Sequence, residues 1–129
     1  MSCITENTIV IKASAENALK KDIDLAINDT YYRFRLQNVK KAFENDEYVV
    51  YIFDCNGDQP WEVADADYFS LDWGDVIAME TVYEDGRWTR YTDKDGVMQD
   101  TNRKLTTIMK NKLTEIEYEN LCQNIMYSI

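Results

Sequence analysis

Carboxylates are the side chains of this sequence that could do chemistry, and they are concentrated in one stretch. Between Lys41 and Arg87 lie 45 residues, which include 13 of the 24 Asp and Glu and no Lys, Arg or His. The rest of the chain holds the other 11 acidic residues against all 14 Lys and Arg, so this stretch accounts for the whole net charge of −10. Such an asymmetry indicates a positively charged partner.

Ten of these carboxylates fall between positions 54 and 85 without a local counter-charge. If many share one face, their repulsion costs stability, because the Debye length of about 8 Å at physiological salt does not fully screen neighbours. A basic partner would relieve that cost. The ten are Asp54, Asp58, Glu62, Asp65, Asp67, Asp72, Asp75, Glu80, Glu84 and Asp85.

The spacing of the acids also suits a mimic of nucleic acid. Alternate residues of a strand face the same way about 6.6 Å apart, and two nucleotides advance about 6.8 Å along one DNA strand. Carboxylates such as Asp65 and Asp67 could therefore occupy phosphate subsites of a protein that grips DNA or RNA, and interleaved aromatics could fill base-stacking pockets. A solvated acidic face that only promotes solubility is the plain alternative. The absence of Lys and Arg across the stretch favours the mimic.

We therefore expect a partner-binding surface within residues 54 to 85. Trp61 and Trp73 flank an irregular acidic segment, and Trp is enriched in interface hot spots. Trp88, in contrast, belongs to a predicted strand and is expected to pack within the fold. The expected contact residues are Asp54, Asp58, Trp61, Glu62, Asp65, Asp67, Tyr68, Phe69, Asp72, Trp73, Asp75, Glu84 and Asp85.

No metal or cofactor is expected. Asp54, Asn56 and Asp58 alternate as at the start of a calcium loop, but position 59 is Gln where an EF-hand requires Gly. With three scattered cysteines and no histidine, the chain also lacks the usual ligands of a zinc site.

Catalysis is poorly supported, and we expect no enzymatic activity. The absence of histidine excludes Ser-His-Asp and Cys-His arrangements, and no glycine-rich phosphate loop or dinucleotide fingerprint occurs. Paired carboxylates could run a glycosidase-like reaction, with Glu62 or Asp65 beside Trp61 as first candidates. Carboxylate pairs arise by chance in so acidic a segment, however.

The basic flanks are expected to serve the fold and not to bind nucleic acid, because a net charge of −10 disfavours contact with a polyanion. They form the polar faces of helices or pair with acids, and pairing between copies would give a head-to-tail oligomer. The residues concerned are Arg33, Arg35, Lys40, Lys41, Arg103, Lys104, Lys110 and Lys112.

Size and composition predict one compact domain over residues 1–129. The amino terminus does not resemble a secretory signal, and no apolar stretch approaches the roughly 20 residues that span a bilayer. Cys3, Cys55 and Cys122 are odd in number and far apart, which disfavours a disulfide framework. A cytoplasmic protein with free thiols is expected.

The first half of the chain predicts a strand, a helix, a short second helix and a second strand. Ile4 to Lys12 is rich in β-branched residues, and Ser14 is placed to cap a helix that runs from Ala15 to about Asn28. A short helix is favoured from about Leu36. Tyr48 to Asp54 predicts the clearest buried strand, and Asn56-Gly57-Asp58 predicts a turn after it.

The second half predicts three strands and two helices. Two Asp-Gly steps separate Val76–Tyr83, Arg87–Tyr91 and Val97–Gln99, which is typical of a β-meander. Leu105 through Ile116 forms one apolar helical stripe, and a capping box at Thr114 and Glu117 predicts a break before a second helix. The fold class is therefore α+β: a mainly antiparallel sheet of about four to five strands packed against an N-terminal helix and C-terminal helices.

In character, a small, acidic, histidine-free domain without motifs resembles the inhibitors that mobile elements use against nucleic-acid enzymes, including anti-CRISPR and anti-restriction proteins. The likeness implies a non-enzymatic inhibitor that occupies the cationic channel of a nuclease or related effector. The alternatives are an immunity protein that neutralises a basic toxin, a small carboxylate- or metal-dependent enzyme, and a scaffold domain.

Overall fold

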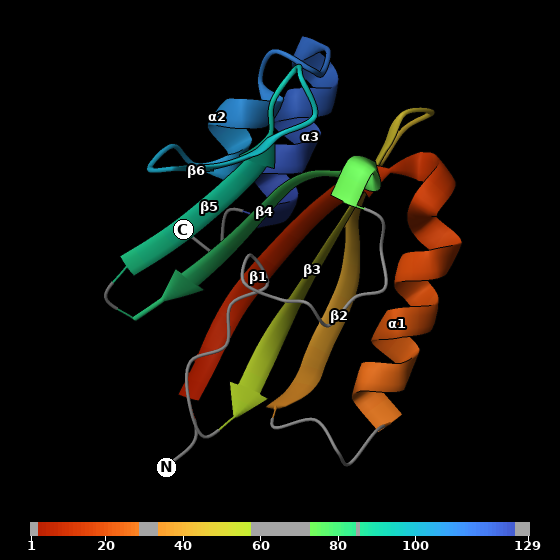
Figure 1. Ribbon diagram of the computed structural model, residues 1–129, viewed down its shortest axis with the longest axis vertical. Coiled ribbons are helices and arrows are strands. Elements are labelled where there is room, and N and C mark those ends of the chain that lie inside the picture. The colour runs from red at the N-terminus through yellow and green to blue at the C-terminus, as the bar shows by residue number, and fades with distance from the viewer. Residues whose placement is uncertain (1–2, 29–33, 58–72, 85, 126–129) are drawn as a thin grey trace.

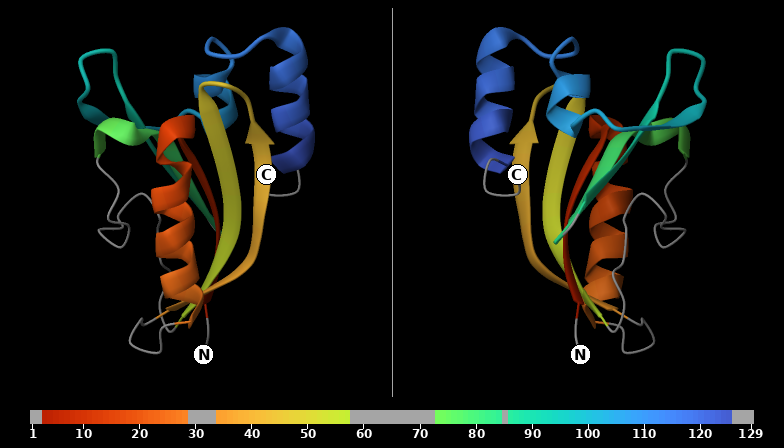
Figure 2. Two further views of the ribbon diagram at one scale, coloured as in Figure 1. Left: turned by 90° about the vertical axis from the view of Figure 1, so that its right-hand side faces the viewer. Right: turned by 90° about the vertical axis from the view of Figure 1, so that its left-hand side faces the viewer.

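The computed structural model describes residues 3–28, 34–57, 73–84 and 86–125, and it shows an α+β fold (Figure 1). Six antiparallel strands form one sheet in the order β2-β3-β1-β4-β5-β6. Helix α1 covers one face of the sheet, and α2 and α3 cover part of the other (Figure 2). The elements are β1 (Cys3–Lys12), η1 (Ala13–Ala15), α1 (Glu16–Asn28), β2 (Phe34–Glu44), β3 (Tyr48–Gly57), η3 (Trp73–Asp75), β4 (Val76–Tyr83), β5 (Gly86–Thr92), β6 (Met98–Thr101), α2 (Leu105–Met109) and α3 (Glu115–Ile125).

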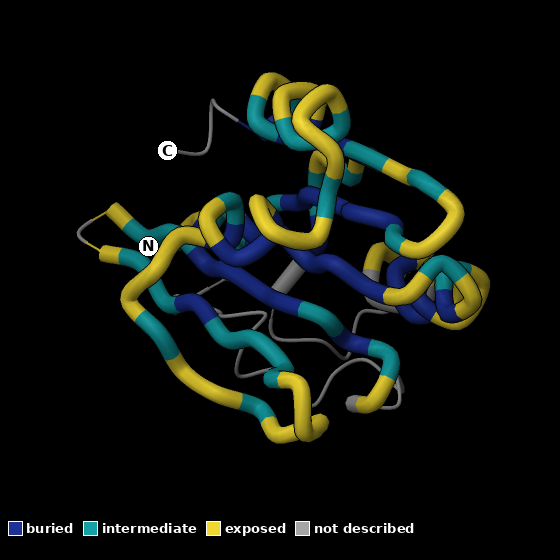
Figure 3. The backbone as a smooth tube through the Cα atoms, turned by 90° about the horizontal axis from the view of Figure 1, so that it is seen from above, coloured by how far each residue is buried: buried dark blue, intermediate teal, exposed yellow. Residues whose placement is uncertain are grey.

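The middle parts of the central strands β1 and β3 are buried on both faces, which explains why their apolar residues run consecutively there (Figure 3). Side chains alternate between the faces, so Ile9 and Ile11 of β1 pack toward α1. Val10 lies between them and packs toward α2 and α3.

Within the described residues, no helix has the length and apolar character needed to cross a lipid bilayer.

Helix α1 begins slightly later than the sequence suggested. Ser14 does not cap it, because Ala13–Ala15 form a 3-10 turn and the α-helix starts at Glu16. The predicted apolar face is confirmed at Leu19 and Ile23, which are buried against the sheet.

The short helix expected from Leu36 is wrong, because Phe34–Glu44 forms the edge strand β2 and brings the strand count to six. Leu36 and Val39 fit helical spacing, but the strand is irregular: its register with β3 shifts between Gln37 and Lys40 and again between Lys41 and Phe43. Such bulges break the two-residue alternation that identifies a strand in sequence.

Strands β4, β5 and β6 form the predicted meander. The Asp93 carboxylate accepts hydrogen bonds from the backbone N–H groups of Asp95 and Val97, and Gly96 supplies the positive φ of 81° in this turn. The predicted turn at Asn56-Gly57-Asp58 is only partly within the described residues, and β3 itself continues to Gly57.

The break between the C-terminal helices is confirmed. Thr114 N–H donates to Glu117 Oε1 at 3.0 Å and Glu117 N–H donates to Thr114 Oγ1 at 3.3 Å, as in a capping box. The predicted stripe fails at one position: Ile116 is 72 % exposed, because α3 packs instead through Leu121 and Ile125.

Candidate acidic binding surface

Most residues expected to contact a partner lie outside the described part of the chain. These are Asp58, Trp61, Glu62, Asp65, Asp67, Tyr68, Phe69, Asp72 and Asp85. Trp73 opens the turn η3, which ends at Asp75. Only Asp54, Asp75 and Glu84 of the expected set can be placed with their side chains.

The strand register separates these three acids. Asp54 on β3 pairs with Glu6 of β1, and Glu6 pairs in turn with Val82, two residues before Glu84. Asp54 and Glu84 therefore lie toward the same end of the sheet. Asp75 lies at the opposite end, because it directly precedes the residue of β4 that pairs with Ile11.

The strand register places Asp54 opposite a second carboxylate, on a residue that sequence reasoning missed. Glu6 lies outside the acidic stretch, but it occupies the β1 position directly opposite Asp54, where Cβ atoms are about 5 Å apart in an antiparallel pair. Burial and the Asp54 charge together raise the pKa of Glu6 above its ordinary value. The alternation of Glu6 with Thr8 and Val10 along β1 is the signal that would have placed it on this face.

Strand β2, which pairs with β3 on the side away from β1, contacts the Asp54 carboxylate through a bulge. Asn38 lies within the first register shift, has a positive φ of 55°, and donates from Nδ2 to Asp54 Oδ2 at 2.8 Å. Asn tolerates this left-handed conformation better than most residues. The bulge thus directs an amide toward the carboxylate and leaves its other oxygen for a second donor.

A second acidic feature is a groove of about 380 Å³ between the β2–β3 turn and the α2–α3 connection. Asn45 Nδ2 donates to Glu117 Oε2 across it at 2.9 Å. The same carboxylate accepts from the Thr114 N–H, and the pKa of Glu117 is lowered, first by that backbone hydrogen bond and then by Asn45. The groove is lined by Asn45, Asp46, Glu47, Asn111, Lys112, Leu113, Thr114 and Glu117.

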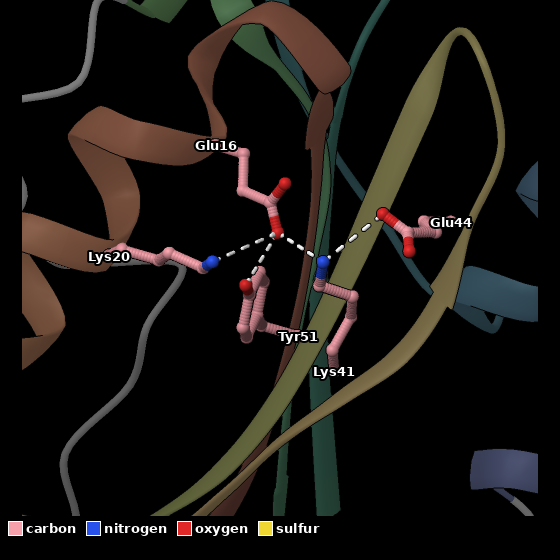
Figure 4. A network of polar contacts seen from close by, with 5 residues as sticks. All are labelled: Glu16, Lys20, Lys41, Glu44 and Tyr51. Carbon is pink, nitrogen blue, oxygen red and sulfur yellow. Dashed lines mark hydrogen bonds and ion pairs between the residues drawn. The ribbon is translucent and has the colours of Figure 1, made fainter.

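Lys41, the cation that precedes the acidic stretch, is fully engaged within the fold (Figure 4). Its ammonium lies 2.6 Å from Glu16 Oε2 on α1 and 3.1 Å from Glu44 Oε2 on its own strand. These carboxylates, Glu16 first, raise the pKa of Lys41. Glu16 Oε2 also accepts from the Tyr51 hydroxyl at 2.6 Å and lies 3.9 Å from Lys20.

Arg87, the cation that follows the stretch, is also used internally. Its Nε lies 3.7 Å from Glu80 Oε2, and the Glu80 carboxylate is buried. The same oxygen accepts from Thr89 Oγ1 at 3.1 Å and from the Leu105 N–H at 2.8 Å. Both cations that bound the acidic stretch therefore neutralise acids inside the fold.

The described residues contain no group of three or more His, Cys, Asp or Glu that could hold a metal ion. Cys55 and Cys122 are free thiols. Burial, together with the Asp54 charge, raises the pKa of Cys55 to about 12, so this thiol is a poor nucleophile.

Comparison with known protein families, with curated protein sequences and with solved structures finds no match to this chain.

Proposed function

We propose that this protein is a non-enzymatic inhibitor that binds a basic nucleic-acid-binding protein, such as a nuclease or a defence effector of the kind that anti-CRISPR and anti-restriction proteins block. Its carboxylates take the places of phosphates in the partner's cationic channel. Complementary charge speeds association, and aromatic contacts slow dissociation.

One observation supports this proposal above the others: most of the described acids of the acidic stretch lack internal compensation. The bounding cations compensate only two acids of the stretch, Glu44 through Lys41 and Glu80 through Arg87, and Lys41 also pairs with Glu16 of α1. The remaining acids of the stretch that the structure describes form no ion pair with those Lys and Arg whose side chains are described. They are Asp46, Glu47, Asp54, Asp75 and Glu84.

The test is capture of a partner from host lysate by the tagged protein, with and without added duplex DNA as competitor. The first variant changes Asp65, Asp67, Asp72 and Asp75 to Asn. A control with the same net charge changes acids outside the stretch: Asp24→Asn, Asp95→Asn, Glu115→Gln and Glu119→Gln. This pairing separates the position of the charge from its total.

The proposal predicts that the native protein and the control retain a nucleic-acid-binding protein, and that the first variant loses it. DNA should displace that protein, and retention should fall steeply as salt rises. Equal retention by both variants, or a partner that DNA does not displace, would instead favour a scaffold domain or an immunity protein.

A further inference from the structure

The groove between the β2–β3 turn and the α2–α3 connection carries opposite charges on its two sides. Asp46 and Glu47 line it on the turn, and Lys112 lines it on the connection. All three residues are exposed. We call the side with Asp46 and Glu47 the acidic wall and the side with Lys112 the basic wall.

The two walls do not neutralise each other within one molecule. Neither Asp46 nor Glu47 forms an ion pair with Lys112 or with any other Lys or Arg whose side chain is described. Asn45 Oδ1 accepts from two backbone N–H groups of the turn, and Asn45 Nδ2 donates to Glu117 of α3 at 2.9 Å. This hydrogen bond sets the spacing of the walls, and a groove of about 380 Å³ lies between them.

The basic wall belongs to a segment that contains no acid. Between Asp100 and Glu115 lie 14 residues, which include four cations and no Asp or Glu. All four cations are exposed, and none forms an ion pair with an acid whose side chain is described. Charge that is unpaired within the fold is therefore available to a second molecule. The four are Arg103, Lys104, Lys110 and Lys112.

An exposed apolar residue follows the basic wall in the chain. Ile116, in the first turn of α3, is 72 % exposed, the largest fraction among the large apolar residues that the structure describes. It directly precedes Glu117, which lines the groove, and Leu113 of the connection also lines the groove. A molecule seated on the groove and on the first turn of α3 would remove Ile116 from water, which favours association.

Neighbouring walls of opposite charge make a surface that is complementary to its own copy. A two-fold axis at the groove places the basic wall of each molecule against the acidic wall of the other, so every contact occurs twice. A purely acidic or purely basic partner would match only one wall. We infer that this groove, together with Ile116, is the interface of a symmetric dimer of the chain, in which Lys112 of each copy contacts Asp46 of the other.

The inference goes beyond the proposed function and does not depend on it. The net charge of −10 opposes self-association at long range. At physiological salt, however, the Debye length is about 8 Å, so distant charges are largely screened while charges in contact are not. Asp54, for example, lies six residues along β3 from Tyr48 at the turn, which is about 20 Å. Asp54 therefore stays free for a basic partner in the dimer.

The experiment is sedimentation velocity of the full chain at physiological salt over a rising concentration series. We expect a reversible equilibrium between monomer and dimer. Lys112→Glu should weaken dimerisation about tenfold, because it reverses one charge in both symmetric contacts. Lys94→Glu, in the β5–β6 turn, changes the net charge equally and should leave the dissociation constant unchanged. Ile116→Ser should weaken the dimer, whereas Val97→Ser, at another exposed apolar residue, should not.

A charge exchange tests which residues meet. Asp46→Lys alone should also weaken dimerisation about tenfold. A mixture of the Lys112→Glu chain and the Asp46→Lys chain should form a heterodimer, because one contact is then native and the other has its charges exchanged. Far-UV circular dichroism shows whether each variant is folded.

Three results would overturn the inference. They are a monomer at every concentration, equal dissociation constants for Lys112→Glu and Lys94→Glu, and no heterodimer in the mixture of the two variants. The proposed function has a separate readout. Capture of a nucleic-acid-binding protein by a chain that stays monomeric would sustain that function and end the dimer, and a dimer without such capture would do the opposite.

Discussion

The Glu80 carboxylate accepts a hydrogen bond of 2.8 Å from the backbone N–H of Leu105, the first residue of α2. No side chain caps this helix locally, because its N-cap residue is Lys104 and makes no capping hydrogen bond. A buried acid on β4 therefore does the work of a cap from 25 residues away. It ties the C-terminal helices to the sheet.

Replacing Glu80 with Ala should lower the free energy of unfolding by about 2–4 kcal/mol, because Thr89 and the Leu105 N–H lose their common acceptor and Arg87 loses its ion-pair partner. Glu80→Gln should cost less, since its amide oxygen can still accept. Urea denaturation measures both, and amide exchange should show faster opening at residues 105–109. The exposed Glu84→Ala is the control; a loss as large as that of Glu80→Ala would contradict this account.

Glu6→Gln should stabilise the protein by about 0.5 kcal/mol at pH 7, because it removes a charge that is partly buried and that is repelled by Asp54. The raised pKa of Glu6 determines how this effect on stability varies with pH. Above that pKa the charged carboxylate destabilises the folded state, and the destabilisation disappears as the pH falls through the pKa. The variant's advantage in urea denaturation should therefore vanish near pH 3. Equal stability at pH 7 would show that the pair costs nothing.

Glu16→Gln, unlike Glu6→Gln, should destabilise the protein at pH 7. The pKa of Glu16 is lowered, chiefly by its hydrogen bonds from Lys41 and then Tyr51, so its contribution is present above the ordinary pKa of 4.5 and is lost as pH falls through the lowered value. We expect a loss of about 1 kcal/mol at pH 7 that shrinks toward pH 3. Thermal unfolding at several pH values tests this, with Glu119→Gln as control. A loss independent of pH would exclude the ionic explanation.

Asn38 should tolerate Gly better than Ala. Both changes remove the hydrogen bond to Asp54, but only Ala adds the strain of a positive φ, about 1–2 kcal/mol. Asn38→Ala should therefore be the less stable variant by about 1 kcal/mol in urea denaturation. Equal losses would mean that the strand relaxes out of the bulge at this position.

Some features were determined locally, and the sequence was sufficient for them. The β-branched runs of β1 and β3, the Asp95-Gly96 turn of the meander and the capping box of Thr114 and Glu117 depend on neighbours within a few residues. The α+β class followed from their order. The net acidity of residues 42–86 is likewise a property of the chain itself.

Other features exist only because distant residues meet. The bulged strand β2 was misassigned because pairing with β3, and not local alternation, sets its conformation. Ile116 was placed in the core by spacing but is exposed, because the capping box resets the phase of the helix. The sequence showed how many acids there are, whereas the strand register decided which of them face each other. Glu6 meets Asp54 through a pairing across 48 positions of chain, which no local pattern encodes.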